Sequence, residues 1–314
     1  MKLTDKQILV TGGGGFLGTA VVNELHKRGV SAEHIRAPRS ADCDLRVRKN
    51  CEEAVRGADI VFHLAANAGG IGYNRTHPGL LFYDNIVMNT ELMEAARKEG
   101  VQKFLGIGSI CSYPKFTPIP FKESDFWNGY PEETNAPYGL AKKMMQVQAD
   151  AYHQEYGFNA ISLLIANLYG PHDHFDPKVS HLIPAIIRKI DEAQRQGQNW
   201  VEAWGTGEPT REFFYVEDAA EGIVLAMEKY DKPNPINLGS GQEIRIGDVI
   251  RKIVEIMEFK GEIRWNPGQP DGQPRRTFDI SKAKEEFGFV AKTPFDTGLR
   301  TTVKWYRAQQ KRAL

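Results

Sequence analysis

The stretch TGGGGFLG at residues 11–18 decides the fold class, because it joins an apolar run of strand length to a segment with helical periodicity. Gly12, Gly15 and Gly18 follow the predicted opening strand and begin the predicted helix. Glycines at such a junction allow a tight turn and a close approach of the backbone to a ligand, and the free N–H groups of the helix N-terminus attract a pyrophosphate. A glycine-rich match alone is weak, and its ordinary alternative is a flexible turn. Its position directly after the first strand favours a dinucleotide-binding site.

Apolar runs of strand length alternate with longer amphipathic segments up to residue 168, as in ADIVFHLA (58–65), VQKFLGIGS (101–109) and AISLLIAN (160–167). Such alternation is typical of βαβ units and of a parallel sheet that helices cover on both faces. We therefore predict an α/β fold with a doubly wound parallel Rossmann sheet in residues 1–168, to which the chain returns near 213–240. Residues 169–314, where Pro, Gly and Trp become frequent, are expected to form mainly a smaller α/β substrate-binding lobe.

The composition argues against several classes of partner. The chain has 314 residues, of which 41% are hydrophobic, and its 40 basic residues balance its 40 acidic ones, so it offers no electrostatic footprint for nucleic acid or an anionic membrane. No apolar stretch reaches 18 residues and none resembles a leader, which leads us to expect a cytoplasmic protein. Cys43, Cys51 and Cys111 form no CxxC motif and histidines do not cluster, so we expect neither disulfides nor a metal site.

The segment after the predicted second strand bears on the choice of cofactor. NAD enzymes place an acidic residue there to bind the ribose. In HIRAPRSADCDL (34–45), Arg36 and Arg39 come first and no carboxylate precedes Asp42. This order favours NADP, with Arg39 as the contact to the 2′-phosphate, and the alternative is a solvated basic turn.

Two further motifs carry side chains suited to proton transfer. In YGLAK (138–142), Tyr138 and Lys142 are four residues apart and share a helix face. A cation some 4 Å from a phenolate contributes roughly 4 kcal/mol at an effective dielectric of about 20, which would lower the pKa of Tyr138 by about 3 at most. In GSICSYPK (108–115), Ser109 and Cys111 are two residues apart, so in an extended chain both side chains would point to the same side. An exposed helix face is the ordinary alternative for the first motif.

Together these motifs resemble the extended short-chain dehydrogenase/reductase family, whose catalytic residues are Ser, Tyr and Lys and whose substrates are mostly nucleotide sugars. The resemblance covers essentially the whole chain and includes the segments 204–223 and 236–250. Within the family, GSICSYPK, NLYGPHDHFDPKVSHLIPAII (167–187) and PDGQPRR (270–276) resemble the GDP-L-fucose synthases. Those enzymes are bifunctional epimerases and reductases of GDP-4-keto-6-deoxy-D-mannose.

The resemblance implies a role for each catalytic side chain. Inversion at C3 and C5, next to the C4 ketone, removes a proton from one face and returns it from the other, and this work falls to Cys111 and His181. Either of the two could be the base, since the reference pKa values of cysteine and histidine bracket neutrality. Ser109 would hydrogen-bond the ketone oxygen, Tyr138 would deliver its proton, and Lys142 would also hold the nicotinamide ribose. A lone buried cysteine is, however, more often a small hydrophobic residue.

The resemblance also implies two sets of binding residues. The expected cofactor-binding residues are Gly12, Gly15, Phe16, Leu17, Gly18, Arg39, Asp44, Leu45, Leu64, Ala65, Ala66, Tyr138, Lys142, Asn167, Leu168 and His181. The expected substrate-binding residues are Ser109, Asn167, Leu182, Lys189, Trp204, Arg211, Asp271 and Arg276. Lys189 replaces the usual arginine and Arg276 the usual lysine, so charge is kept but bidentate geometry is not, and the exact sugar and nucleotide stay open. The segment GGIGYN, Gly69 to Asn74, is expected to approach the sugar, unless it is simply a tight glycine turn.

The expected activity is therefore NADPH-dependent conversion of GDP-4-keto-6-deoxy-D-mannose to GDP-L-fucose by an enzyme that is a homodimer in this family. One alternative is a GDP-mannose 3,5-epimerase or a related enzyme acting on a deoxyheptose or colitose precursor. His181, where the 3,5-epimerase is expected to use lysine, and the arginines after the second strand argue against the first of these. A non-catalytic NADP-sensing or RNA-binding relative is the third interpretation, although such proteins usually lose the tyrosine or the lysine.

Overall fold

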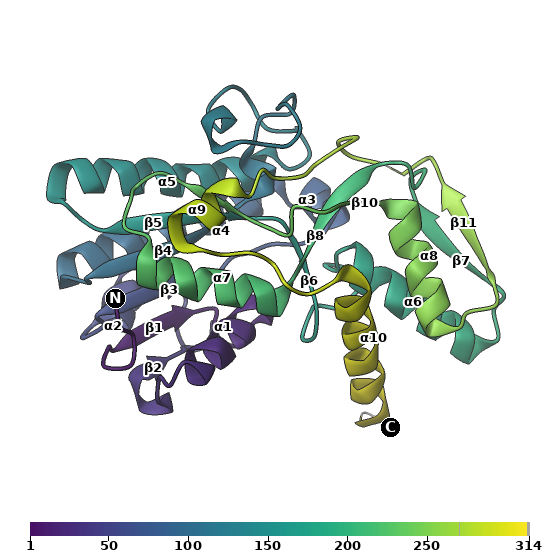
Figure 1. The fold of residues 1–314 in the computed structure, drawn as a ribbon, viewed down its shortest axis with the longest axis horizontal. Helices are drawn as coiled ribbons and strands as arrows, with labels where there is room; N and C mark the ends of the chain where they lie inside the picture. The colour runs from purple at the N-terminus through teal and green to yellow at the C-terminus, as the bar shows by residue number, and fades with distance from the viewer. Residues whose placement is uncertain (270, 313–314) are drawn as a thin grey trace.

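The computed structural model describes residues 1–269 and 271–312, and a six-stranded sheet forms its centre (Figure 1). The strand order is β2-β1-β3-β4-β5-β9, and every neighbouring pair is parallel. The strands are β1 (Ile8–Thr11), β2 (Ile35–Arg36), β3 (Ile60–His63), β4 (Lys103–Ser109), β5 (Ala160–Ile165) and β9 (Ile236–Leu238). The prediction of a parallel Rossmann sheet is confirmed.

Helices cover both faces of this sheet because its strands are apolar on both sides. In β1, Ile8 and Val10 belong to one core and Leu9 to the other, as the alternation of side chains along a strand requires. The first core lies against α1 and α7, and the second against α2, α4 and α5. These helices are α1 (Phe16–Lys27), α2 (Arg48–Val55), α4 (Pro78–Glu99), α5 (Ala136–Tyr156) and α7 (Val216–Lys229).

A second set of elements, drawn at the right of Figure 1, has its own core. In α6 the buried residues Ile183, Ile186, Ile187 and Ile190 recur at the spacing of one helix face, and α8 has the same pattern. The helices here are α6 (Leu182–Gln196), α8 (Ile246–Met257) and α10 (Phe295–Arg312). They pack with the sheets β10-β8-β6 and β11-β7, whose strands are β6 (Asn167–Tyr169), β7 (Trp200–Trp204), β8 (Thr210–Tyr215), β10 (Glu243–Arg245) and β11 (Glu262–Asn266).

The chain passes between the two sets more than once. Strand β8 belongs to the second set, but α7 follows it directly and packs on α1 of the first set. The short helix α9 (Ser281–Phe287) then contacts α7 and β9. The remaining elements are α3 (Ile71–Thr76) and the single 3₁₀ turns η1 (Ala32–His34), η2 (Ile110–Ser112) and η3 (Glu123–Asp125).

The sheet order determines where a ligand can bind. From β1 the chain continues to β2 on one side of the sheet, and from β3 it continues to β4 and β5 on the other side. The strand order therefore reverses between β1 and β3. In open α/β sheets, ligands bind at the carboxyl ends of the strands next to such a reversal. Thr11, His63 and Ser109 end β1, β3 and β4 at this edge. Over the described ranges, no helix is both long and apolar enough to cross a membrane.

Candidate active site

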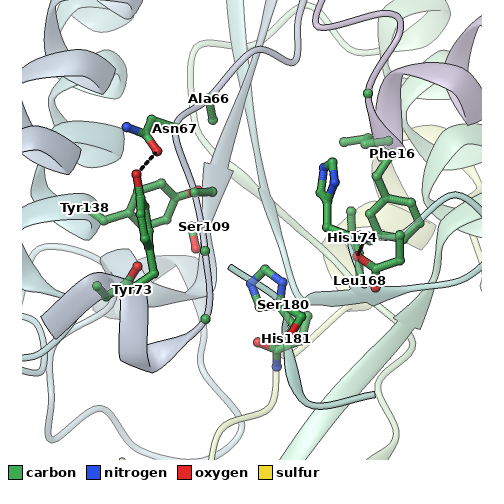
Figure 2. A pocket seen from close by; sticks show the side chains of 18 of the residues that line it. Phe16, Ala66, Asn67, Tyr73, Ser109, Tyr138, Leu168, His174, Ser180 and His181 are labelled. Carbon is green, nitrogen blue, oxygen red and sulfur yellow. Dashed lines mark hydrogen bonds between the residues drawn. The ribbon is translucent and has the colours of Figure 1, made fainter. Parts of the chain in front are cut away.

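A cavity of about 1110 Å³ opens at the carboxyl edge of the sheet, and both sets of elements contribute to its wall. Apart from Lys142, every residue predicted from the sequence to bind cofactor or substrate or to act in catalysis lies on this wall. These are Gly12, Gly15, Phe16, Leu17, Gly18, Arg39, Asp44, Leu45, Leu64, Ala65, Ala66, Ser109, Cys111, Tyr138, Asn167, Leu168, His181, Leu182, Lys189, Trp204, Arg211, Asp271 and Arg276. In Figure 2, Ser109 and Tyr138 lie on one wall of the pocket, Phe16, Leu168 and His174 lie on the other, and His181 lies between them.

The glycine loop fits a dinucleotide diphosphate. Gly12 has φ +71°, and a Cβ there would lie 2.9 Å from the Ala65 nitrogen, while a Cβ on Gly18 would lie 2.0 Å from the Gly12 oxygen. A Cβ on Gly14 would meet nothing within 4 Å, so the loop borders open space. Helix α1 has Gly15 as its N-cap, with no side-chain cap and no acidic residue in its first turn. Its first N–H groups are therefore available to an anion.

The structure distinguishes Arg36 and Arg39, the two arginines at and just after the end of the second strand. Arg36 Nη2 donates to the Arg56 carbonyl at 2.7 Å, which ties it to the protein. Arg39 is exposed at the cavity, and within the described residues its guanidinium makes no hydrogen bond or ion pair. Asp44, which we expected at the cofactor, is ion-paired with Arg46 at 2.8 Å, and this arginine also contacts Asp84 at 3.1 Å. The pKa of Asp44 is lowered, mainly by its hydrogen bond to Arg46.

Close packing of two helical segments brings Tyr138 to Ser109 and Cys111. A Cβ on Gly139 would lie 2.4 Å from the Cys111 carbonyl oxygen, so the start of α5 lies directly on the turn η2. The Ser109 hydroxyl accepts a hydrogen bond from the Cys111 nitrogen at 3.1 Å and caps this turn. The pKa of Tyr138 is raised, first by burial and then by Cys111, whereas Ser109 opposes the rise.

The expectation that Lys142 lowers the pKa of Tyr138 is not met. Lys142 is buried, does not lie on the cavity wall and is not among the groups that shift the pKa of Tyr138. Burial lowers the pKa of Lys142 itself to about 8, so much of its charge is lost at mildly alkaline pH. Its electrostatic effect falls on His63, whose pKa is lowered to about 3 by burial and then by Lys142.

His63 is a residue that the sequence analysis did not single out. Its Nδ1 is 2.8 Å from Thr11 Oγ1 and its Nε2 is 2.9 Å from Asn89 Oδ1, so both ring nitrogens have partners. Asn89 Nδ2 in turn donates to the Ala141 carbonyl at 3.3 Å, one residue before Lys142. This neutral, buried histidine links β1, β3, α4 and α5 below the cavity, which is a structural role.

Cys111 and His181 both reach the cavity. Cys111 comes from the first set of elements, and His181 comes from the second. Cys111 is half-buried and free, and its Sγ accepts a hydrogen bond from Arg276 Nη1 at 3.3 Å. His181 is the N-cap residue of α6. Its side chain is exposed to the cavity, and protein atoms surround it on the other sides. This enclosure lowers the pKa of His181, and His174 lowers it further.

Two of the three cationic residues predicted to bind substrate, Lys189 and Arg211, are held by backbone carbonyl groups. Lys189 Nζ donates to the Glu202 carbonyl at 2.9 Å and lies 5.9 Å from the centre of the Trp204 ring. Arg211 donates to the carbonyls of Thr210 at 2.7 Å and Asp271 at 2.9 Å. Burial, followed by the charge of Arg276, lowers the pKa of Arg211 to about 9. Both residues thus keep their cationic ends at the cavity without a carboxylate hydrogen bond among the described residues.

The segment Gly69 to Asn74 lies on the cavity wall, and it is more than a glycine turn. It contains the first four residues of α3, and a Cβ on Gly72 would lie 3.5 Å from the Trp204 ring. Tyr73 Oη donates to Asn67 Oδ1 at 3.2 Å, which is the dashed line in Figure 2, and Asn67 Nδ2 donates to Asp84.

Several cavity residues were therefore missed from the sequence. They include Arg46, Asn67, Asp84, Asp173, His174 and Ser180. Burial raises the pKa of Asp173 to about 7, and its Oδ2 has no partner among the described residues. The run PHDH (171–174) was the one sequence signal for Asp173 and His174, whereas no local pattern marks Arg46 or Asp84.

The comparisons with known proteins agree with this architecture. The model of the NAD dependent epimerase/dehydratase family matches residues 8–239. The chain is 38% identical to a probable GDP-L-fucose synthase of Oryza sativa subsp. japonica, over 97% of this chain and 93% of that protein. It is 32% identical to the GDP-L-fucose synthase of Escherichia coli strain K12, over 99% of each.

Two solved structures are similar over nearly their full length. A GDP-6-OMe-4-keto-L-xylo-heptose reductase from C. jejuni superposes with a TM-score of 0.91 at 26% identity, over 98% of this chain and 99% of that one. A GDP-L-fucose synthetase from Naegleria fowleri bound to NADP superposes with a TM-score of 0.86 at 29% identity, over 99% of this chain and 97% of that one. The glycine loop at the first strand, the Ser109 and Tyr138 pair and the full-length match identify this chain as a member of the NAD dependent epimerase/dehydratase family, the extended short-chain dehydrogenases/reductases, with the GDP-L-fucose synthases among its relatives.

Proposed function

We propose that this protein is an NADPH-dependent epimerase and reductase that converts GDP-4-keto-6-deoxy-D-mannose to GDP-L-fucose. The observation that carries the proposal is that one cavity contains the glycine loop, Ser109 and Tyr138 on one side and Cys111 and His181 from two different lobes. A reductase alone needs only the glycine loop, Ser109 and Tyr138. Cys111 and His181 supply two further proton carriers, which inversion at carbon requires.

Epimerisation in this proposal uses Cys111 and His181 as an acid–base pair. The base removes the proton from C3 or C5, the electron pair moves to the C4 ketone oxygen, and the resulting enolate is protonated on the opposite face by the acid. Because the lowered pKa of His181 keeps much of its imidazole neutral near pH 7, His181 can accept a proton as well as return one. The order of the two roles stays open, as it did from the sequence.

Reduction in this proposal uses Ser109 and Tyr138. NADPH, when bound along the glycine loop, supplies the hydride for C4. Tyr138 gives its phenolic proton to the C4 oxygen, and its raised pKa keeps that proton in place until the oxygen becomes basic. Ser109 hydrogen-bonds the same oxygen. Lys142 would hold the nicotinamide ribose.

Two features support NADP rather than NAD as the cofactor. Arg39 is exposed at the cavity without an ion pair among the described residues, while Asp44, a carboxylate that could bind a ribose, is already paired with Arg46. The related structure from Naegleria fowleri contains NADP. The GDP moiety would bind near Lys189, Trp204 and Arg211, whose cations and apolar ring suit a diphosphate and a base.

A second candidate function is reduction of a GDP-linked 4-keto-heptose. The similarity to the heptose reductase from C. jejuni favours it, because the two folds agree over nearly their whole length. An enzyme of this kind need not invert C3 or C5. The two functions are therefore separated by asking whether Cys111 and His181 exchange carbon-bound protons.

We further propose that two copies of the chain associate through α4 and α5, which pack on one another at the surface. Leu80, Phe82, Tyr83, Met144 and Val147 on these helices are exposed, and an apolar helix face of this kind is suited to burial in a dimer. Sedimentation of the wild type and of Val147→Asp would test it, with a monomeric wild type as the contrary result.

The division of the chain into two domains is likewise our proposal. The first comprises residues 1–168 with a return at 213–240, and the second comprises mainly residues 169–314. The cytoplasmic location stays a prediction.

The deciding experiment uses Cys111→Ser, which replaces a thiol of reference pKa about 8.5 with a hydroxyl that hardly ionises in water. Wild type and variant are incubated with the 4-keto sugar in deuterated water, C3 and C5 are followed by NMR, and NADPH is then added. We expect the wild type to incorporate deuterium at both carbons and form GDP-L-fucose. The variant should incorporate little deuterium and slowly form an unepimerised 6-deoxy sugar. Exchange at the wild-type rate in the variant would make Cys111 a packing residue, and no exchange in the wild type would refute the epimerase.

A further inference from the structure

The side chain of Arg276 is built into the protein next to Cys111. Arg276 is 5% exposed, and its Nη1 donates to Cys111 Sγ at 3.3 Å across a separation of 165 residues. Its Nε donates to Gln273 Oε1 at 3.1 Å. Gln273 Nε2 in turn donates to the carbonyl of Lys115, four residues beyond Cys111, at 2.8 Å. The guanidinium is thus oriented on the thiol by an amide that is itself fixed to the loop after the cysteine.

The charges around Cys111 are predominantly positive. Arg276 contacts its sulfur, Tyr138 and Arg211 interact with its charge, and the Ser109 hydroxyl accepts a hydrogen bond from its backbone nitrogen. In the described part of the chain the hydrogen-bond partners of both arginines are carbonyl oxygens, an amide and the thiol, so neither cation is neutralised by direct contact with a carboxylate. Asp271 and Glu132 act on Arg211 only at longer range, and the Asp271 carboxylate binds Thr206. Buried guanidinium groups are ordinarily paired with an anion.

We propose that Arg276 is a positioning residue that orients the Cys111 sulfur and stabilises the thiolate that forms during proton exchange at carbon. The inference rests on the proposed function, in which Cys111 is a thiolate once in each inversion. When the thiolate takes the substrate proton, the C–H bond breaks, an S–H bond forms and the electron pair passes to the ketone oxygen; when the thiol donates, the same steps run in reverse. A guanidinium N–H binds S⁻ more strongly than S–H, and its direction limits where the sulfur lone pairs point.

This role differs from that of a cation that only binds substrate. A lysine, the residue expected here from the family pattern, would supply a mobile point charge, whereas the planar guanidinium of Arg276 binds Gln273 and Cys111 at the same time. We therefore expect Arg276→Lys to keep part of the effect on the thiol and Arg276→Gln to lose it.

The test measures alkylation of Cys111 by iodoacetamide from pH 6 to 10, followed by peptide mass spectrometry, in the full chain without sugar or cofactor. Cys43, half-buried and with a pKa raised mainly by burial, serves as a reference thiol in the same sample. The variants are Arg276→Gln and Arg276→Lys. Arg275→Gln is the matched control, because this neighbouring arginine is exposed and paired with Glu243.

For Arg276→Gln we expect the alkylation rate of Cys111 at pH 7 to fall by roughly tenfold or more, the size of one lost charge-assisted hydrogen bond, and its rise with pH to move to higher pH. Arg276→Lys should lie between this variant and the wild type, and Arg275→Gln and the Cys43 rates should not change. An unchanged Cys111 profile in Arg276→Gln overturns the proposal, as does a profile in which Cys43 shifts equally, which would mean that the fold has loosened. Because no sugar is present, a shifted profile together with absent deuterium exchange would refute the proposed function and not this contact.

Discussion

Arg39→Ala is the substitution that most directly tests how the cofactor is chosen. The structure limits which other cation could take over from Arg39. Arg36 is bound to the Arg56 carbonyl, and Arg46 is paired with both Asp44 and Asp84. Arg39 alone of these three makes no hydrogen bond or ion pair through its guanidinium within the described residues, and it lies on the cavity wall. Its loss should therefore remove a charge-assisted hydrogen bond to the 2′-phosphate without replacement.

A hydrogen bond to a charged group contributes roughly 1.5 to 3 kcal/mol, so the KM for NADPH should rise by about tenfold to 150-fold. Because Arg39 is exposed and its charge is screened by solvent, the lower part of this range is expected. NADH has no 2′-phosphate, so its KM should change by less than about twofold. The assay is steady-state oxidation of each cofactor at saturating 4-keto sugar, with Arg36→Ala as the matched control. Equal effects of Arg39→Ala on the two cofactors, or a larger NADPH effect in Arg36→Ala, would refute the reasoning.

Two further substitutions address the helix α5. Tyr138→Phe should suppress NADPH oxidation at least a hundredfold because the C4 oxygen loses its proton donor, while cofactor affinity measured by fluorescence titration stays within about twofold; near-normal turnover would contradict the assignment. Lys142→Met should stabilise the cofactor-free protein against urea while abolishing reduction. Because the pKa of Lys142 is lowered from 10.5 to about 8 in the folded state, the unfolded chain binds more protons between these pH values and the stability of the wild type rises with pH there. The advantage of Lys142→Met, about 3 kcal/mol, should be complete below pH 8 and vanish above pH 10.5, and a pH-independent difference would count against it.

The fold could be predicted from the sequence because its signals are local. Gly18 of TGGGGFLG is required by a contact within the same strand-to-helix turn, because its Cβ would lie 2.0 Å from the Gly12 oxygen. The apolar runs identified as strands are buried on both faces, as β4 is over its whole length. The return of the chain through α9 has no comparable local signal. Its residues reach α7 and β9 through packing that is long-range in the sequence.

The site could be predicted only in part, for a related reason. Motif spacing placed Tyr138 and Lys142 on one helix face, but spacing does not specify burial, and burial governs the pKa of both. The cost of transferring a charge from water into the protein opposes the phenolate and the ammonium alike. Sequence analysis therefore identified the pair and overestimated the effect of one on the other. Residues such as Asp84 and His63 were missed because their partners lie in other elements of the fold.

The arginines around the cavity show most clearly what only the structure can supply. Sequence analysis can count guanidinium groups, yet their availability to a ligand depends on what each one already binds. Arg46 has two carboxylate partners, so its charge is compensated within the protein. Arg211 is held by two carbonyl groups, which orient it and leave its positive charge uncompensated by direct contact among the described residues. Arg276 is oriented by an amide toward a thiol that can itself become an anion. Three residues of one type thus differ in their availability to a ligand according to their partners. The charge of Arg46 is compensated, Arg211 is free to receive the substrate diphosphate in the proposed function, and Arg276 is directed at the Cys111 thiol that we propose it helps to ionise.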